Sequence, residues 1–189
     1  EGLDTSEFCR RAGLERSLLT RPDGRFSLDQ LSELWRHAVV HAQDQTLAIR
    51  MGSAIRLAGY GVVGYSMMAS PNLHTALSRM CRYMKIISDI TEMSLCTLDV
   101  GVRLDFKLHI QPDSAHRQRH EFTFISILTL CRWITARDLR PVQIEFQFPT
   151  PADVQPYQNI FRCPLHFGSV ENGILFSHAD LALRLPTAN

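Results

Sequence analysis

Two pairs of histidines have the spacing that a metal site on a helix requires. His37 and His41 are four residues apart, as are His116 and His120, so each pair would place two imidazoles on one helix face. A metal site also needs a third ligand, and the sequence offers none at a recognisable spacing. The segment that begins at His120 reads His-Glu-Phe-Thr-Phe, so it lacks the second histidine of the HExxH motif. We therefore interpret these residues as surface or capping histidines and expect no metal.

Thiol and nucleotide chemistry are weakly supported as well. Cys163 follows Arg162 and is the better candidate nucleophile, whereas Cys81 falls on an apolar helical stripe. Residues 59–64 have GxGxxG spacing but no preceding strand, so we interpret them as a turn that interrupts regular structure between two helices. The sequence has neither a GxSxG motif nor a P-loop. It therefore predicts a protein that is not an enzyme and that has no cofactor.

Hydroxyl groups in the predicted helix 115–138 are the strongest signal for a binding site. Ser126 lies with Thr123 and Thr129 in an otherwise apolar stretch, where hydroxyls must bond either to their own helix carbonyls or to a ligand. Small-molecule pockets combine apolar walls with a few convergent polar groups, and tyrosines or arginines could supply them. The candidate ligand-binding residues are Arg56, Tyr60, Tyr65, Tyr83, His120, Ser126 and Trp133. Each could equally be an ordinary core or rim residue.

The elements that would position these residues change in period along the chain. Helices are predicted over residues 5–12, from 27 onward, over 46–57 and from 71 onward. Strands are predicted over residues 93–100, 102–110, 142–148, 165–167 and 174–176, with a short helix over 153–161. The fold class expected is α+β, with N-terminal helices followed by a mostly antiparallel sheet packed on one long buried helix.

Composition narrows the class of protein further. The 189 residues suit a single domain, and a net charge of +1 argues against a nucleic-acid-binding surface. The longest apolar run, residues 122–134, is too short and too polar to span a bilayer. Five cysteines without CxxC spacing are typical of a reducing compartment. We expect a cytoplasmic protein with no membrane contact.

The order and spacing of many residues resemble those of a known family. The closing pattern carries most of the likeness: Val142-x-x-x-Phe146, Pro151, Tyr157, Phe161-x-Cys163-Pro164-Leu165-x-Phe167-Gly168, Asn172, Leu175-x-Phe, Leu181 and Leu185-Pro186. Earlier matches are Arg21-Pro-Asp-Gly-Arg25, residues 47–52, Gly61-x-x-Gly64-Tyr65, Ser70-Pro71, Ala76-Leu77 and Arg82-Tyr83. In these positions the chain is similar to the N-terminal effector-binding domain, of the arabinose-binding-domain type, of AraC/XylS-family bacterial transcription regulators.

This resemblance implies a domain that senses a small molecule, forms a homodimer and controls a separate helix-turn-helix domain that binds DNA. The effector stays unidentified. The start at Glu1 and the polar Pro-Thr-Ala-Asn end indicate one domain, residues 1–189, of a longer protein, with the C-terminal helix-turn-helix domain absent. The alternative is a ligand-independent interaction and dimerisation module.

Overall fold

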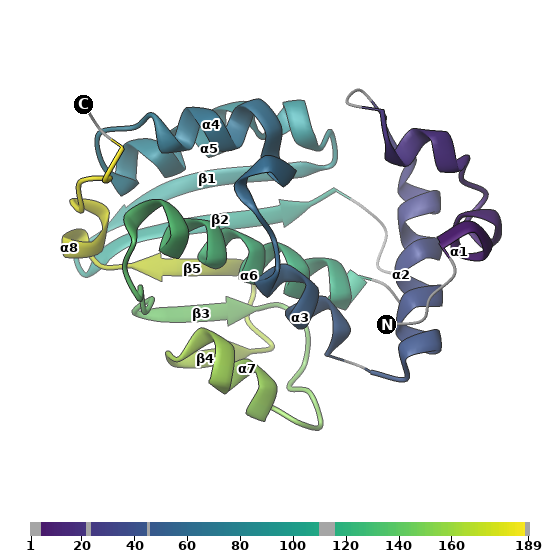
Figure 1. Ribbon diagram of the computed structural model, residues 1–189. Coiled ribbons are helices and arrows are strands. Elements are labelled where there is room, and N and C mark those ends of the chain that lie inside the picture. Colours follow the sequence, from purple (N-terminus) through teal and green to yellow (C-terminus); the bar gives the residue numbers. More distant parts are fainter. Residues whose placement is uncertain (1–4, 22–23, 45, 110–115, 188–189) are drawn as a thin grey trace.

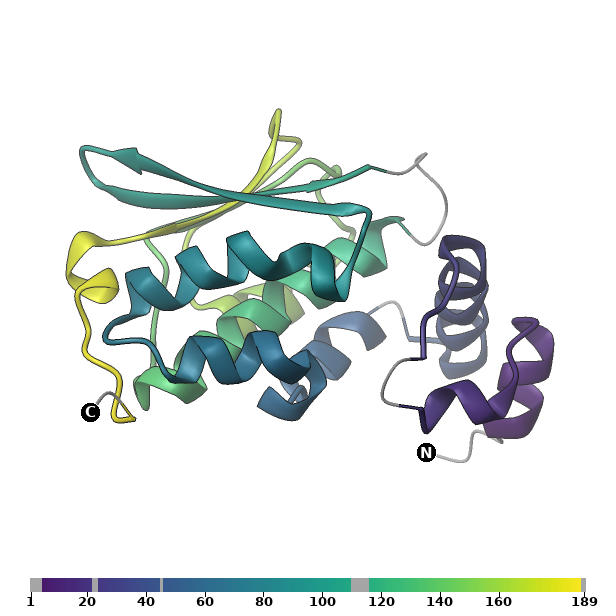
Figure 2. The ribbon, with the colours of Figure 1, turned by 90° about the horizontal axis from the view of Figure 1, so that it is seen from above.

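The computed structural model describes residues 5–21, 24–44, 46–109 and 116–187 of the chain. A five-stranded sheet carries helices on one face, and a group of N-terminal helices lies beyond one end of it (Figure 1; Figure 2). The strands are β1 (Thr91–Leu98), β2 (Gly101–Leu108), β3 (Gln143–Phe146), β4 (Leu165–Phe167) and β5 (Asn172–Phe176). The helices are α1 (Thr5–Arg11), η1 (Arg16–Leu19), α2 (Leu28–Ala42), α3 (Leu47–Ser53), η2 (Leu57–Tyr60), α4 (Gly61–Met68), α5 (Leu73–Ile87), α6 (His116–Thr135), α7 (Gln155–Phe161) and α8 (His178–Leu181).

The sheet has the strand order β1-β2-β5-β3-β4. Its pairs are antiparallel except that of β3 with β4, which is parallel. Along β2, the side chains of Leu104 and Phe106 are buried against the helices, while those of Arg103 and Asp105 face the other side of the sheet. This alternation follows from the two-residue period of a strand. The α+β class and the mostly antiparallel sheet predicted from the sequence are confirmed.

Helix α6 is the long buried helix that the sequence predicts. Leu128 and Cys131 are fully buried in its middle and Phe124 is 1% exposed, because α6 lies between the sheet and α3 (Figure 1). A helix that is apolar on most sides can be stable only when it is covered in this way. Residue 110, predicted to end a strand, and residue 115, predicted to begin this helix, lie outside the described residues.

Gly52 allows α3 to approach α6 closely. A Cβ atom at Gly52 would lie 2.0 Å from Ile125 Cγ2 and 2.9 Å from the carbonyl oxygen of Phe122. We expect Gly52→Ala to lower the free energy of unfolding by about 1–3 kcal/mol, although alanine is the better helix former by about 1 kcal/mol. Urea denaturation measures this loss. The control is Gly59→Ala, whose Cβ would meet only the flexible side chain of Ile55 at 3.2 Å, and equal losses in the two variants would contradict the argument.

The prediction that residues 59–64 interrupt regular structure is wrong. The short helix η2 leads directly into α4, which begins at Gly61 with a φ of 50°. Gly64 lies inside α4, where glycine costs about 1 kcal/mol relative to alanine. Burial of Val63 and Met67, which are 1% and 0% exposed, outweighs that cost. Tertiary packing therefore overrides the local helix-breaking signal.

Candidate functional site

A cleft of about 910 Å³ separates the N-terminal helices from the rest of the domain. Small-molecule sites in proteins have volumes of roughly 300–1,000 Å³, so the cleft is large enough for a metabolite. Its walls come from α1, the segment before α2, α2 itself, α3, η2, the end of α5 with the turn into β1, β2 and α6. The lining residues are Phe8, Gly24, Arg25, Phe26, Ser27, Leu28, Leu31, Leu34, Trp35, Ala38, Met51, Ile55, Gly59, Tyr60, Met84, Ile87, Ser88, Asp89, Ile90, Thr91, Leu108, Arg119, Phe122, Thr123 and Ile127.

Helix α2 forms one wall because its sequence is one-sided. Its apolar residues recur at helical spacing and turn a single stripe toward the cleft. A capping box fixes the start of the helix: the Ser27 hydroxyl accepts from the Gln30 backbone N–H, and the Gln30 side chain accepts from the Ser27 backbone N–H. In the middle of the stripe, the rings of Trp35 and Phe122 lie 5.4 Å apart between centroids at 58°. This contact joins α2 to α6 across the cleft.

Arg119 also joins α2 to α6. It is only 4% exposed and lines the cleft. Its Nη2 atom donates to the carbonyl oxygen of Leu28, at 3.3 Å, and to the hydroxyl of Ser32. These bonds join residues 91 and 87 positions apart in the sequence and hold two neighbouring helices together. A ligand that enters here would therefore change the contacts between the two parts of the domain.

Charged and hydroxyl groups at the rim of the cleft bond to one another. Arg25 lies 3.4 Å from a carboxylate oxygen of Asp89, and its Nη2 donates to the carbonyl oxygen of Ile86 at 3.1 Å. The hydroxyls of Ser88 and Thr91 are 2.7 Å apart. Both charged side chains of the rim pair are more than half exposed, so the pair contributes little to stability.

Tyr60 contributes a phenol group to the wall of the cleft. Burial raises the pKa of Tyr60 well above its usual value, and the nearby Ser126 hydroxyl offsets part of the rise. The phenol therefore stays neutral and can donate or accept a hydrogen bond. The Ser126 Oγ atom is buried behind it without a well-aligned partner among the described residues. Ser126 is fully buried and is not among the residues that line the cleft, so its role in ligand binding stays a prediction.

The structure does not bring the seven predicted ligand-binding residues together. Tyr60 lines the cleft, and Ser126 and His120 lie buried in α6, where the His120 ring packs edge-on against Phe106 at 5.5 Å. The other four, Arg56, Tyr65, Tyr83 and Trp133, are exposed and stand outside the described lining of the cleft. Tyr65 is 56% and Trp133 59% exposed. Their role in binding stays a prediction. Sequence reasoning missed the residues of α2 that line the cleft, because their apolar stripe has the same pattern as that of a helix packed in a core.

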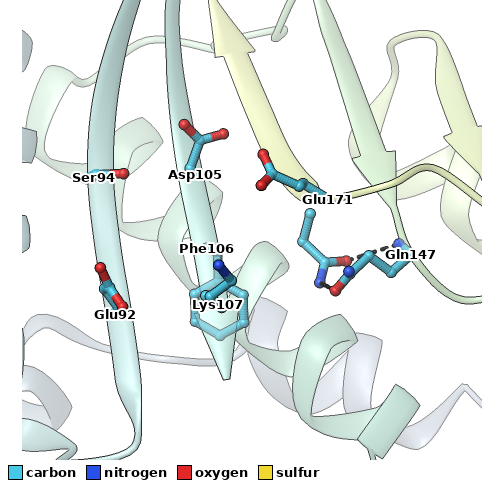
Figure 3. A pocket seen from close by; sticks show the side chains of 8 residues that line it. Glu92, Ser94, Asp105, Phe106, Lys107, Gln147 and Glu171 are labelled. Atoms are coloured by element: carbon cyan, nitrogen blue, oxygen red, sulfur yellow. Dashed lines mark hydrogen bonds between the residues drawn. The ribbon is translucent and has the colours of Figure 1, made fainter. Parts of the chain in front are cut away.

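A second, smaller hollow lies on the outer face of the sheet and is lined by a group of charged side chains. It has a volume of about 120 Å³, too little for most metabolites, and acidic side chains such as Asp105 and Glu171 point into it (Figure 3). Burial first, and then the charges of Glu171 and Glu145, raise the pKa of Asp105, while Arg103 opposes the shift. Arg103 lies 3.0 Å from Asp105 and 3.1 Å from Glu145. The pattern is that of a structural ion-pair network on a sheet face.

Among the described residues, the histidines form no metal site, and Cys81 and Cys163 are not activated thiols. No three metal-ligating side chains cluster within the described residues, which exclude the side chain of His116. Burial raises the pKa of both Cys81 and Cys163 to about 11, so these thiols stay protonated near neutral pH. In the described part of the chain, no helix is long and apolar enough to cross a bilayer.

An α+β domain with one large cleft and no reactive cluster among its described residues is typical of a binding domain. The comparisons identify the class: residues 2–185 match the family described as the arabinose-binding domain, N-terminal, of AraC transcription regulators. The chain belongs to this family, as the resemblance in its sequence predicts. It is therefore a domain of a transcription regulator and not an enzyme.

One curated relative agrees with this assignment, and one solved structure shares the fold. The ornithine utilization regulator of Pseudomonas aeruginosa is 21% identical over 166 residues, which cover 88% of this chain and 49% of that protein. The crystal structure of the transcriptional regulator CdpR from Pseudomonas aeruginosa has the same fold, with a TM-score of 0.72 and 18% identity, and the match covers all of this chain and 60% of that one. The chain thus spans about half the length of the curated relative.

Proposed function

We propose that this chain is the effector-sensing and dimerisation domain of a cytoplasmic transcription regulator, and that it controls DNA binding by a separate C-terminal helix-turn-helix domain. The observation that carries the proposal is the cleft between α2 and α6, where the effector would bind. DNA contact would come from the other domain, because a net charge of +1 gives this chain no overall excess of positive charge. Family membership supports the proposal.

A cleft between two parts of one domain suits an allosteric role. An effector shifts a conformational equilibrium only by binding one arrangement better than the other. A molecule held between Trp35 and Phe122 would favour the arrangement in which α2 is docked on α6. The change in the position of α2 would then be transmitted to the partner subunit or to the DNA-binding domain.

Thermal denaturation with a panel of metabolites tests the sensing role. A compound present at 100 times its Kd should stabilise the fold by about 2.7 kcal/mol, which raises the Tm by roughly 5–10 °C. Thr123→Trp fills the cleft and should abolish the shift. Val40→Ala, on the exposed face of α2 and outside the described lining, should retain it. A panel that produces no shift, or a shift that Thr123→Trp retains, would remove the support for an effector in this cleft.

The second candidate is a ligand-independent dimerisation module. It is favoured by apolar side chains that are largely exposed on the helical side, Val62, Tyr65 and Trp133 among them. Sedimentation velocity separates the two ideas. A dimer whose dissociation constant no metabolite alters would favour the second, and a monomer at high concentration would exclude dimerisation by this domain alone.

A further inference from the structure

The α2 wall of the cleft presents hydrocarbon to whatever enters. Leu28, Leu31, Leu34, Trp35 and Ala38 face the cleft from successive turns. Inside a helix the backbone N–H and C=O groups bond to one another, so this wall offers a ligand almost no hydrogen bonds. The indole of Trp35 is 8% exposed and already packed against Phe122.

The opposite wall has the same character. Phe122 and Ile127 come from α6, Met84 and Ile87 from α5, and Leu108 from β2. These elements are far apart in the sequence and converge only through the fold. A molecule in the cleft would therefore lie between two apolar surfaces.

Polar groups of the described lining are mostly engaged within the protein. Arg25 and Asp89 pair with each other at the rim. Arg119 donates to α2, and Ser27 caps it. Beyond these contacts the inner walls offer the hydroxyls of Tyr60 and Thr123, while the Nε and Nη1 atoms of the lining residue Arg119 are buried from solvent.

A sugar or a zwitterionic amino acid fits such a lining poorly. Each buried hydroxyl, ammonium or carboxylate without a partner loses its hydration, and a few unpaired groups would cancel the gain from the apolar contacts. A molecule with a hydrocarbon body and one hydrogen-bonding group has no such penalty. Its body would displace water from both walls, and its polar group could bond to Tyr60 or Thr123.

The geometry points to a hydrophobic effector, an uncharged aliphatic or aromatic molecule with one hydrogen-bonding group, bound between α2 and α6. This inference rests on the proposed function, because it takes the cleft as the effector site. The inferred effector is neither a sugar, as the name of the family suggests, nor the amino acid in the name of the curated relative.

Displacement of a neutral fluorescent probe tests the inference on the whole 189-residue chain. N-phenyl-1-naphthylamine should bind and quench Trp35, and 1-alkanols from hexanol to decanol should displace it. Affinity should rise about fourfold for each added methylene, the factor expected when a CH₂ group is fully buried. Of the two tryptophans, Trp35 lines the cleft and Trp133 does not. Trp35→Phe should therefore lose most of the quenching.

A matched pair of leucine variants locates the site. Leu31→Lys places a charge in the cleft and should weaken probe binding at least tenfold. Leu19→Lys changes a 46% exposed leucine of η1, outside the described lining, and should bind the probe as the wild type does. If Leu31→Lys does not fold, Thr123→Trp replaces it, with the same expected loss. Unchanged affinity in the cleft variant, or an alkanol series without a slope, would overturn the inference.

Polar compounds distinguish the failure of this inference from that of the proposed function. L-arabinose and L-ornithine should neither displace the probe nor raise the Tm. If either compound raises the Tm of the wild type but not of the cleft variant, the cleft is an effector site and the hydrophobic class is wrong. If neither the alkanols nor any polar compound binds, the inference and the sensing role fail together.

Discussion

Replacing Arg117 with methionine should lower the free energy of unfolding by about 3 kcal/mol at neutral pH, because it leaves Glu121 charged in the core without its cation. Glu121 has no exposed surface, and Arg117 Nε donates to its Oε1 atom at 2.5 Å. The hydroxyl of Tyr157 donates to the same oxygen and accepts from Arg117 Nη2 at 2.8 Å. Arg117 is partly exposed, so we take the lower end of the range measured for broken buried pairs.

The loss should depend on pH in a definite direction. Burial raises the pKa of Glu121 above its usual 4.5, although Tyr157 and Arg117 both oppose the shift. A carboxyl whose pKa is raised on folding binds more protons in the folded state, so its contribution to stability is complete below pH 4.5 and falls as the pH rises through the raised value. Without Arg117 the pKa rises further. The Arg117→Met variant should thus be penalised most at pH 8 and least near pH 5.

Urea denaturation at pH 5, 6, 7 and 8 measures both effects. The control is the double variant Arg117→Met/Glu121→Gln, which removes the buried charge together with its partner. It should recover most of the lost stability and show little pH dependence over this range. If the single variant is equally destabilised at all four pH values, a buried charge at Glu121 is not the cause.

A second large loss of stability is expected for Phe146→Ala. Phe146 lies on β3 and is fully buried. Its ring is the centre of an aromatic cluster with centroid distances of 4.8–6.2 Å to Phe124, Phe148, Tyr157, Phe161 and Phe167. Removing such a ring from a packed core costs about 3–5 kcal/mol, which corresponds to a decrease in Tm of roughly 6–20 °C.

The matched control is Phe26→Ala, which removes a phenylalanine that is 37% exposed. It should cost about 1 kcal/mol or less, since little surface returns to water. Differential scanning calorimetry of both variants gives the comparison. A loss below 2 kcal/mol for Phe146→Ala would mean that the cluster relaxes to fill the space.

Much of the fold could be predicted because its signals are local. Ser27 and Asn72 act as helix caps by bonding to backbone groups three residues on. The alternation along β2 predicts which side chains face the core. The spacing from Phe161 to Gly168 carried the family resemblance, which the match over residues 2–185 confirms. The prediction failed where burial outweighs a local signal, as at Gly64 in α4, and it missed the short helices η1 and α8.

The site depends on contacts that no sequence window contains. Tyr60 and Trp133 are both aromatic candidates from the sequence, but Tyr60 lines the cleft and Trp133 is exposed at the far end of α6. The sequence by itself determined the class, the family and the order of the strands and the longer helices, because helix and strand periods, caps and motif spacing act over a few residues. The cleft exists because α2 docks on α6 through Arg119 and Ser32, 87 residues apart, and such docking depends on the shapes of surfaces that form only after the elements have folded.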